Sequence, residues 1–157
     1  MKKYFLDTNV LIEMIRDSES WKRIAKQHGL NDSGLKLYTS YASSAELLAI
    51  SKMNAWGNKK LEKMDYILKN MEIITMKGNA IRELYAEIDA YSRGKHPNKK
   101  LPKGQSAFIL GKNDLWIAAS AAHFKIPLLT ADYDFELLNN VFLEVIIIPP
   151  MISDDSE

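Results

Sequence analysis

Short apolar segments alternate with longer segments of helical periodicity, and this alternation constrains the fold more than any other feature of the chain. Five segments have the length and residue types of β-strands: residues 4–6, 35–40, 71–76, 126–129 and 144–148. No two of them are joined by an obvious hairpin turn, and helical segments separate them. The sequence therefore predicts an α/β fold with a mostly parallel, five-stranded sheet.

The helical segments differ in how much of their surface is apolar. Residues 79–92 form the clearest amphipathic pattern, whereas residues 115–124 are apolar nearly all round and are expected to be buried. Other helices are expected after residue 9, over 21–28 with Ser20 as cap and Gly29 as stop, from 43 to about 53, over 59–70, and from the 130–135 corner to about 140.

Composition narrows the class of protein. The chain has 157 residues, a formal net charge of +1 and no cysteine, which excludes disulfides and thiolate metal sites. The length predicts one domain over residues 1–150, with an acidic C-terminal tail at 151–157. The three histidines have no zinc spacing, so any metal would be a hard cation held by carboxylates. Without a membrane-length apolar run or a signal peptide, a soluble cytoplasmic protein is expected.

Carboxylates occur where the predicted strands end and the predicted helices begin. Asp7 directly follows the first strand, and Asp132 and Asp134 follow the fourth. Glu46 and Asp114 are placed at the amino ends of helices. In a parallel sheet with right-handed crossovers these positions belong to one edge, where open α/β folds bind their ligands.

Each of these acids also has a simpler explanation as a helix cap. Asp7 or Asn9 can cap the first helix, Ser43 and Glu46 have the spacing of a capping box, and Asp114 can cap its own helix. Capping does not require the acids to converge, however. If they do converge, their mutual repulsion is expected to need a divalent cation, and Mg²⁺ or Mn²⁺ suits oxygen ligands and phosphoryl chemistry.

Four segments around these acids resemble, in order, the signature segments of PIN-domain ribonucleases, and most of all the VapC-type toxins of toxin–antitoxin pairs. They are LDTNVLI at Asp7, SSAELLA at Glu46, KNDLWIAASA at Asp114 and TADYDF at Asp132 and Asp134, and they span about residues 3–148. The resemblance implies a PIN-like three-layer fold with strand order 3-2-1-4-5 and a Mg²⁺- or Mn²⁺-dependent endoribonuclease. It also implies a homodimer and an antitoxin protein that inserts a segment into the acidic cleft.

The resemblance also assigns roles to individual residues. Asp7, Glu46 and Asp114 match the three most constant acids of the family, and Asp132 occupies the usual place of the fourth. Asp134 is a nearby alternative that could act through water, and either one or two metal ions fit this set. The polar residues that match supporting positions are Thr8 or Asn9, and Thr130.

A basic stretch separates the amphipathic helix from the buried helix and departs from many toxins of this type. No acidic residue occurs between Ala90 and Asn113, and the glycines and prolines there favour a loop. It is either solvated surface or a basic arm that contacts RNA phosphates. The candidate RNA-binding residues are Arg93, Lys95, Lys99, Lys100 and Lys103.

Two other functions compete with metal-dependent cleavage of RNA phosphodiester bonds. A phospho-aspartate enzyme has the same fold class, but it needs a second aspartate two residues after Asp7, where this chain has Asn9. The other alternative is a catalytically silent PIN domain that acts as an RNA- or protein-binding module. The four intact acidic segments favour the ribonuclease.

Overall fold

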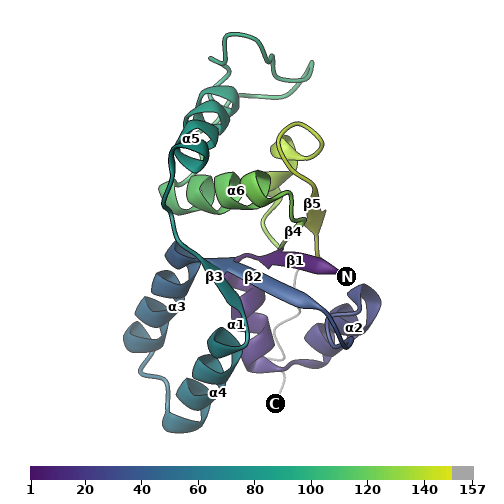
Figure 1. The fold of residues 1–157 in the computed structure, drawn as a ribbon, viewed down its shortest axis with the longest axis vertical. Helices are drawn as coiled ribbons and strands as arrows, with labels where there is room; N and C mark the ends of the chain where they lie inside the picture. Colours follow the sequence, from purple (N-terminus) through teal and green to yellow (C-terminus); the bar gives the residue numbers. More distant parts are fainter. Residues whose placement is uncertain (150–157) are drawn as a thin grey trace.

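The strands form one fully parallel sheet, which confirms the predicted fold class. The structure is a computed structural model that describes residues 1–149, so the predicted acidic tail lies outside the described residues. The sheet order is β3-β2-β1-β4-β5, as the resemblance implies (Figure 1). The strands are β1 (Lys3–Leu6), β2 (Lys36–Ser40), β3 (Glu72–Ile74), β4 (Leu128–Thr130) and β5 (Val145–Ile147).

Helices cover both faces of this sheet and give three layers (Figure 1). One face carries α1 (Thr8–Arg16), α2 (Glu19–His28), α3 (Tyr41–Met53) and α4 (Asn58–Lys69). The other carries α5 (Asn79–Ser92), α6 (Lys112–Phe124) and the short 3₁₀ helix η1 (Tyr133–Leu138). The prediction of α5 is confirmed at both ends, and α6 is buried along most of its length as expected.

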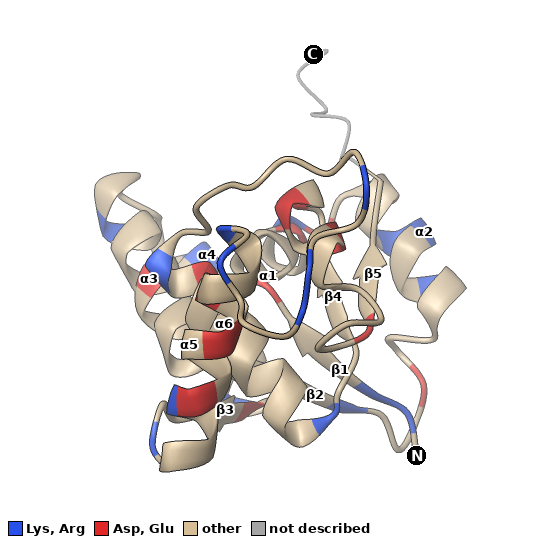
Figure 2. Ribbon diagram, turned by 90° about the horizontal axis from the view of Figure 1, so that it is seen from above, with Lys and Arg blue, Asp and Glu red and all other residues tan. Residues whose placement is uncertain are grey.

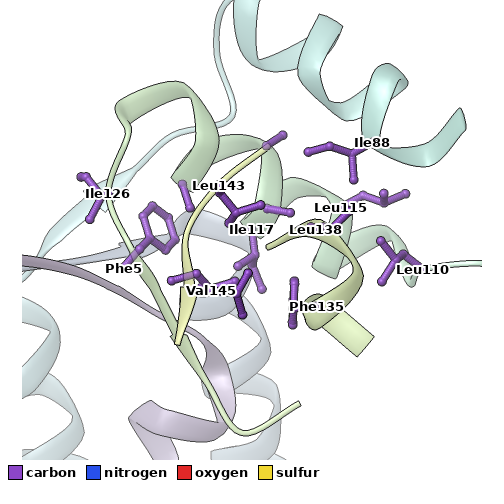
Figure 3. Close-up of a cluster of buried hydrophobic side chains, with 14 of the residues drawn as sticks. Phe5, Ile88, Leu110, Leu115, Ile117, Ile126, Phe135, Leu138, Leu143 and Val145 are labelled. Atoms are coloured by element: carbon purple, nitrogen blue, oxygen red, sulfur yellow. The ribbon is translucent and has the colours of Figure 1, made fainter. Parts of the chain in front are cut away.

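The two cores follow from the alternation of side chains along the central strands. Successive strand residues point to opposite faces of a sheet. Phe5 and Leu128 therefore belong to the core beneath α5 and α6, whereas Leu6 and Leu129 belong to the core beneath α1 to α4. All four side chains are fully buried, and Figure 3 shows the first of these cores, with Phe5 labelled. This packing fixes the position of Asp7, which directly follows Leu6.

Two predicted caps were wrong. The side chain of Ser18, not Ser20, caps α2 by accepting a hydrogen bond from the backbone N–H of Trp21. Helix α3 begins at Tyr41, directly after β2, and Ser40 caps it by accepting from the N–H of Ser43 at 2.9 Å. Glu46 therefore lies in the second turn of α3, and the capping-box explanation of Glu46 does not hold.

The order of the strands places a crevice at the carboxyl ends of β1 and β4. The chain adds β2 and β3 on one side of β1 and then crosses to add β4 and β5 on the other. Such a reversal opens a crevice at the carboxyl ends of the two strands that flank it, where α/β proteins bind their ligands. Among residues 1–149 no helix is long and apolar enough to cross a membrane.

Candidate metal centre

Asp7 lies at the carboxyl end of β1 and is 5% exposed. Its backbone N–H donates to the carbonyl oxygen of Leu129 at 3.1 Å, which continues the β1–β4 pairing by one residue. Its Oδ1 accepts a hydrogen bond of 2.7 Å from the N–H of Thr8 and so caps α1. Asp7 is therefore a helix cap and also a buried carboxylate at the crevice, so the two explanations are compatible.

The second oxygen of Asp7 is held by two side chains. Its Oδ2 accepts from Oγ1 of Thr130 at 2.7 Å and from Nδ2 of Asn9 at 3.0 Å. Oδ1 of Asn9 in turn accepts from the N–H of Ala131 at 3.1 Å. These bonds join the turn after β1 to the end of β4 and fix the orientation of the Asp7 carboxylate.

Glu46 reaches the same place from α3, which packs against α1. Oγ1 of Thr8 donates to Oε2 of Glu46 at 3.1 Å. The side chain is half-buried, and its helix position brings it to the amino end of α1. Thr8, Asn9 and Thr130, the three supporting residues suggested by the sequence, thus all contact one of the acids.

Asp132 and Asp134 occupy different positions in the turn after β4. The N–H of Asp132 donates to Oγ1 of Thr130 at 3.0 Å, so Asp132 is adjacent to the residue that holds Asp7. Oδ1 of Asp132 accepts from the N–H of Asp134 at 2.9 Å and caps η1. Asp134 is exposed, so Asp132 is the inner and Asp134 the outer acid of this turn.

Asp114 lies in the first turn of α6 and is half-buried. Burial raises the pKa of its carboxyl to about 7, and the negative charges of the other four acids add to the effect. Those acids, in order of their contribution, are Asp7, Asp132, Glu46 and Asp134. The structure thus brings all five acids predicted from the sequence to one site, although they come from four separate segments.

The pKa of Asp7 is also raised, mainly by burial and further by the charges of Glu46 and Asp132. The hydrogen bonds from Thr130 and Thr8 act in the opposite direction because they stabilise the charged form. None of the ion pairs formed within residues 1–149 involves any of the five acids. Their charge is therefore uncompensated by basic side chains in the described part of the chain.

The donor set suits a hard divalent cation, although the acids are not yet arranged around one. Carboxylate oxygens are the ligands that Mg²⁺ and Mn²⁺ prefer, and a cation would offset the repulsion that raises the pKa of Asp114. Within the described residues, however, no three acidic or histidine side chains already lie close enough together to hold a metal ion. The carboxylate side chains would have to rearrange when a cation binds.

The candidate RNA-binding residues lie on the loop between α5 and α6, at the top of Figure 1 and coloured blue in Figure 2. Arg93 pairs with Asp89 at 2.8 Å, and Nζ of Lys99 lies 5.4 Å from the centre of the Phe142 ring. Lys95, Lys100 and Lys103 are exposed. The loop is organised around His96, whose Nδ1 accepts from the N–H groups of Asn98 and Lys99 at 3.1 and 2.9 Å.

The sequence did not single out three further residues near the acids. A methyl group on Gly111 would lie 3.3 Å from Oδ2 of Asp114, so glycine leaves room beside that carboxylate. Phe108 and Tyr133 line a cleft that includes Asp134. The aromatic residue between Asp132 and Asp134 was a visible signal for Tyr133. The sequence held no such signal for Gly111 or for Phe108, which lies in a loop.

The comparisons with known proteins agree with this geometry. A sequence model of the PIN domain matches residues 4–140, and the chain belongs to the PIN-domain family. This confirms the family inferred from the four acidic segments. A search of curated proteins finds no match.

Several solved structures share the fold. VapBC2 from Rickettsia felis, bound to a DNA fragment from its promoter, is 24% identical with a TM-score of 0.64, covering 91% of this chain and 98% of that one. DNA-bound VapBC from Salmonella typhimurium is 20% identical with a TM-score of 0.68, covering 94% and 98%. VapBC-5 from Mycobacterium tuberculosis, a member of the VapBC family of toxin–antitoxin systems, is 21% identical with a TM-score of 0.61, covering 94% and 100%. At these identities the likeness is one of fold.

Proposed function

We propose that this protein is a Mg²⁺- or Mn²⁺-dependent endoribonuclease that hydrolyses RNA phosphodiester bonds. The observation that carries the proposal is that four other carboxylates lie close enough to Asp114, near the carboxyl ends of β1 and β4, for their charges to add to the effect of burial, which raises the pKa of Asp114 to about 7. A fold has no structural need to gather like charges there, because capping requires only Asp7 and Asp132 at these positions.

Asp7, Glu46 and Asp114 would hold the main cation, and Asp132 would complete the site or hold a second ion. Asp134, the outer acid, would act through water. When bound, such a cation activates water and offsets charge on the leaving oxygen. Hydrolysis by water in line with the scissile bond would leave 5′-phosphate and 3′-hydroxyl ends.

The chain's own contribution to this chemistry is to hold the acids in position. Thr130 and Asn9 fix one oxygen of Asp7, and Thr8 holds Glu46. The chain has no cysteine, and its histidines lie at the end of α2, in the α5–α6 loop and near the end of α6, so the proposal involves no covalent histidine or cysteine intermediate.

The biological role we propose is that of a VapC-type toxin in a toxin–antitoxin pair. The support is the fold shared with VapBC complexes over nearly the whole of both chains. The partner would be a cognate antitoxin protein that inserts a segment into the acidic cleft, and the toxin would form a homodimer. Sedimentation equilibrium tests the homodimer, since the monomer has a mass of 17.9 kDa.

A divalent-metal titration followed by an RNA cleavage assay tests the enzymatic function. Purified protein should cleave single-stranded RNA with Mg²⁺ or Mn²⁺ and lose this activity in chelator. Asp114→Asn and Asp7→Asn should each abolish cleavage while keeping the fold, because asparagine retains the shape and, at Asp7, the ability to cap α1. Asp65→Asn, an exposed acid on α4, is the matched control and should leave cleavage unchanged.

The alternative function is a catalytically silent PIN domain that binds RNA or protein. The observation that favours it is that no three ligating side chains in the described part of the chain lie in metal-binding geometry. RNA binding without cleavage at any Mg²⁺ or Mn²⁺ concentration would support this module and contradict the ribonuclease.

For the toxin role, a short neighbouring gene whose product co-purifies with this chain and inhibits it is the expected finding.

A further inference from the structure

A cleft of about 480 Å³ separates the α5–α6 loop from η1 and the segment that follows it. Pro102, Gln105 and Phe108 line it from the loop, and Tyr133, Asp134 and Val141 line it from the opposite side. Its volume is in the range of small-ligand sites in proteins. None of these residues except Asp134 is assigned a part in the proposed metal centre.

The cleft adjoins the acidic site. Asp134 lines the cleft, and its backbone N–H donates to the carboxylate of Asp132, the inner acid of the same turn. Tyr133 lies between the two acids in sequence. A ligand in the cleft would therefore extend from the metal centre, and the reacting phosphate and the cleft would be occupied by neighbouring parts of one substrate.

The cleft offers aromatic surface on both walls. Tyr133 is 60% exposed, although the hydrogen bond that caps η1 fixes its backbone. On the opposite wall, the N–H of Phe108 donates to the carbonyl oxygen of Ser92 at 2.9 Å and anchors the loop to the end of α5. An exposed aromatic side chain on a fixed backbone is suited to stacking against a flat ring, because little conformational freedom is lost on binding.

Basic side chains lie next to residues that form the cleft. Lys103 follows Pro102 of the loop wall, and Lys99 lies against the ring of Phe142, which follows Val141 of the opposite wall. His96 holds this part of the loop through its two backbone hydrogen bonds. The aromatic rings suit the flat base of a nucleotide, and the lysines of the neighbouring loop suit its phosphates, whereas Asp134 and Glu136 give the opposite wall of the cleft negative charge. A duplex cannot present its bases in this way, since they are stacked and paired.

We propose that this cleft binds an unpaired nucleobase of single-stranded RNA next to the phosphate at the acidic site, with Tyr133 as the stacking surface. The inference rests on the proposed ribonuclease function and adds a base-binding subsite to it. Tyr133 thereby becomes a binding and specificity residue.

The test compares RNA affinity among variants of Tyr133. A labelled, unstructured RNA oligonucleotide is titrated with Asp114→Asn protein, which binds without cleaving, and affinity is followed by fluorescence anisotropy. Adding Tyr133→Ala should weaken binding roughly fivefold to a hundredfold, the range measured when stacking aromatics are truncated. Tyr133→Phe should keep nearly full affinity. Tyr66→Ala is the matched control, because Tyr66 is 70% exposed but lies on α4.

An abasic scan shows whether a base occupies the cleft. Oligonucleotides that lack one base at successive positions should show one position where the missing base weakens binding, and Tyr133→Ala should abolish that sensitivity. A duplex of the same sequence should be insensitive to Tyr133→Ala. Equal affinity of Tyr133→Ala and its parent for the single strand would overturn the inference.

The failure of this inference can be told apart from the failure of the proposed function. Metal-dependent cleavage with normal KM in Tyr133→Ala would leave the ribonuclease intact and remove the base-binding cleft. Base-specific binding that depends on Tyr133, without cleavage by the wild-type protein, would retain the cleft and support the silent module. Binding of acidic peptides that competes with RNA only in the presence of Tyr133 would show that the cleft is a protein site, and would overturn the inference as well.

Discussion

The hydroxyl of Thr130 donates a hydrogen bond of 2.7 Å to the carboxylate of Asp7, across 123 positions of sequence. Thr130 ends β4 and Asp7 follows β1, and the two strands pair in parallel with Leu6 opposite Leu129. Thr130 Oγ1 also accepts from the N–H of Asp132. The side chain of Thr130 thus connects Asp7 to Asp132, the inner acid of the turn after β4.

Replacing Thr130 with valine should destabilise the protein by about 1.5–3 kcal/mol at a pH at which Asp7 is ionised, the range for hydrogen bonds to charged groups. The cost should decrease at acidic pH, because the hydroxyl stabilises the charged form of Asp7 and lowers its pKa. Urea unfolding at two pH values measures this. Thr39→Val is the matched control, since Thr39 is equally buried but donates to the carbonyl oxygen of Leu6. Its cost should be independent of pH, and identical pH behaviour of the two variants would contradict the assignment.

The metal-free protein should lose stability as pH rises between about 4 and 7. The carboxyl of Asp114 has a pKa near 3.8 when unfolded and about 7 when folded, so in this interval the folded state binds more protons than the unfolded state. The raised pKa of Asp7 acts with the same sign. Chelator-treated protein should therefore melt at progressively lower temperature up to pH 7.

The variant Asp114→Asn should flatten this pH dependence, because the amide does not titrate. Asp65→Asn on the surface of α4 should retain the slope of the wild-type protein. The measurement is the melting temperature of the wild-type protein, Asp114→Asn and Asp65→Asn over the same pH interval. A slope in Asp114→Asn as steep as that of the wild type would mean that another group is responsible.

Magnesium should stabilise the chelator-treated protein. A ligand that binds only the folded state at one hundred times its dissociation constant contributes about 2.7 kcal/mol. Differential scanning calorimetry should show a melting temperature that rises with the logarithm of Mg²⁺ concentration. Sodium chloride at matched ionic strength should not reproduce the rise, and Asp7→Asn should reduce it. A melting temperature that does not respond to Mg²⁺ at neutral pH would argue against the metal centre.

Changing Lys99, Lys100 and Lys103 to glutamine should weaken RNA binding mainly at low salt. Removing one lysine–phosphate interaction reduces the salt slope by roughly 0.7 for single-stranded nucleic acid, so the three substitutions together should reduce it by about 2. The cleavage rate at saturating RNA should change little. The control triple variant replaces Lys26, Lys52 and Lys69, which are exposed on α2, α3 and α4. Equal salt slopes for the two triple variants would exclude the loop as a phosphate-binding surface.

The elements of the fold could be predicted because their residue patterns are local. The periodicity over 79–92 predicted α5 with its correct ends, and the five strand segments were found within a few residues of their observed positions. The caps of α2 and α3 were predicted wrongly because several serines near the start of each helix can act as its N-cap. Only the path of the backbone decides which serine caps the helix. Ser40 is the cap of α3 because β2 leads into that helix without a loop.

The five acids could be named from the sequence because their segments follow strands or begin helices. What the sequence could not supply was their relation to one another. Whether Asp132 or Asp134 is the inner acid depends on a single turn of η1, and that turn is fixed by the hydrogen bond from Asp134 N–H to Asp132. The cleft beside Tyr133 depends on where a loop of irregular structure lies, which no periodicity encodes.

By itself, the sequence determined the fold class and the strand segments, and it predicted which acids follow strands or lie near the starts of helices, because hydrophobic spacing and helix signals act between residues near each other in the chain. Only the tertiary structure decided that Asp7 is held by Thr130, that Glu46 is held by Thr8, and that repulsion and burial raise the pKa of Asp114 to about 7. These effects depend on distances of a few ångströms between segments far apart in sequence, since hydrogen bonds and unscreened charges act only at such range once the chain has folded.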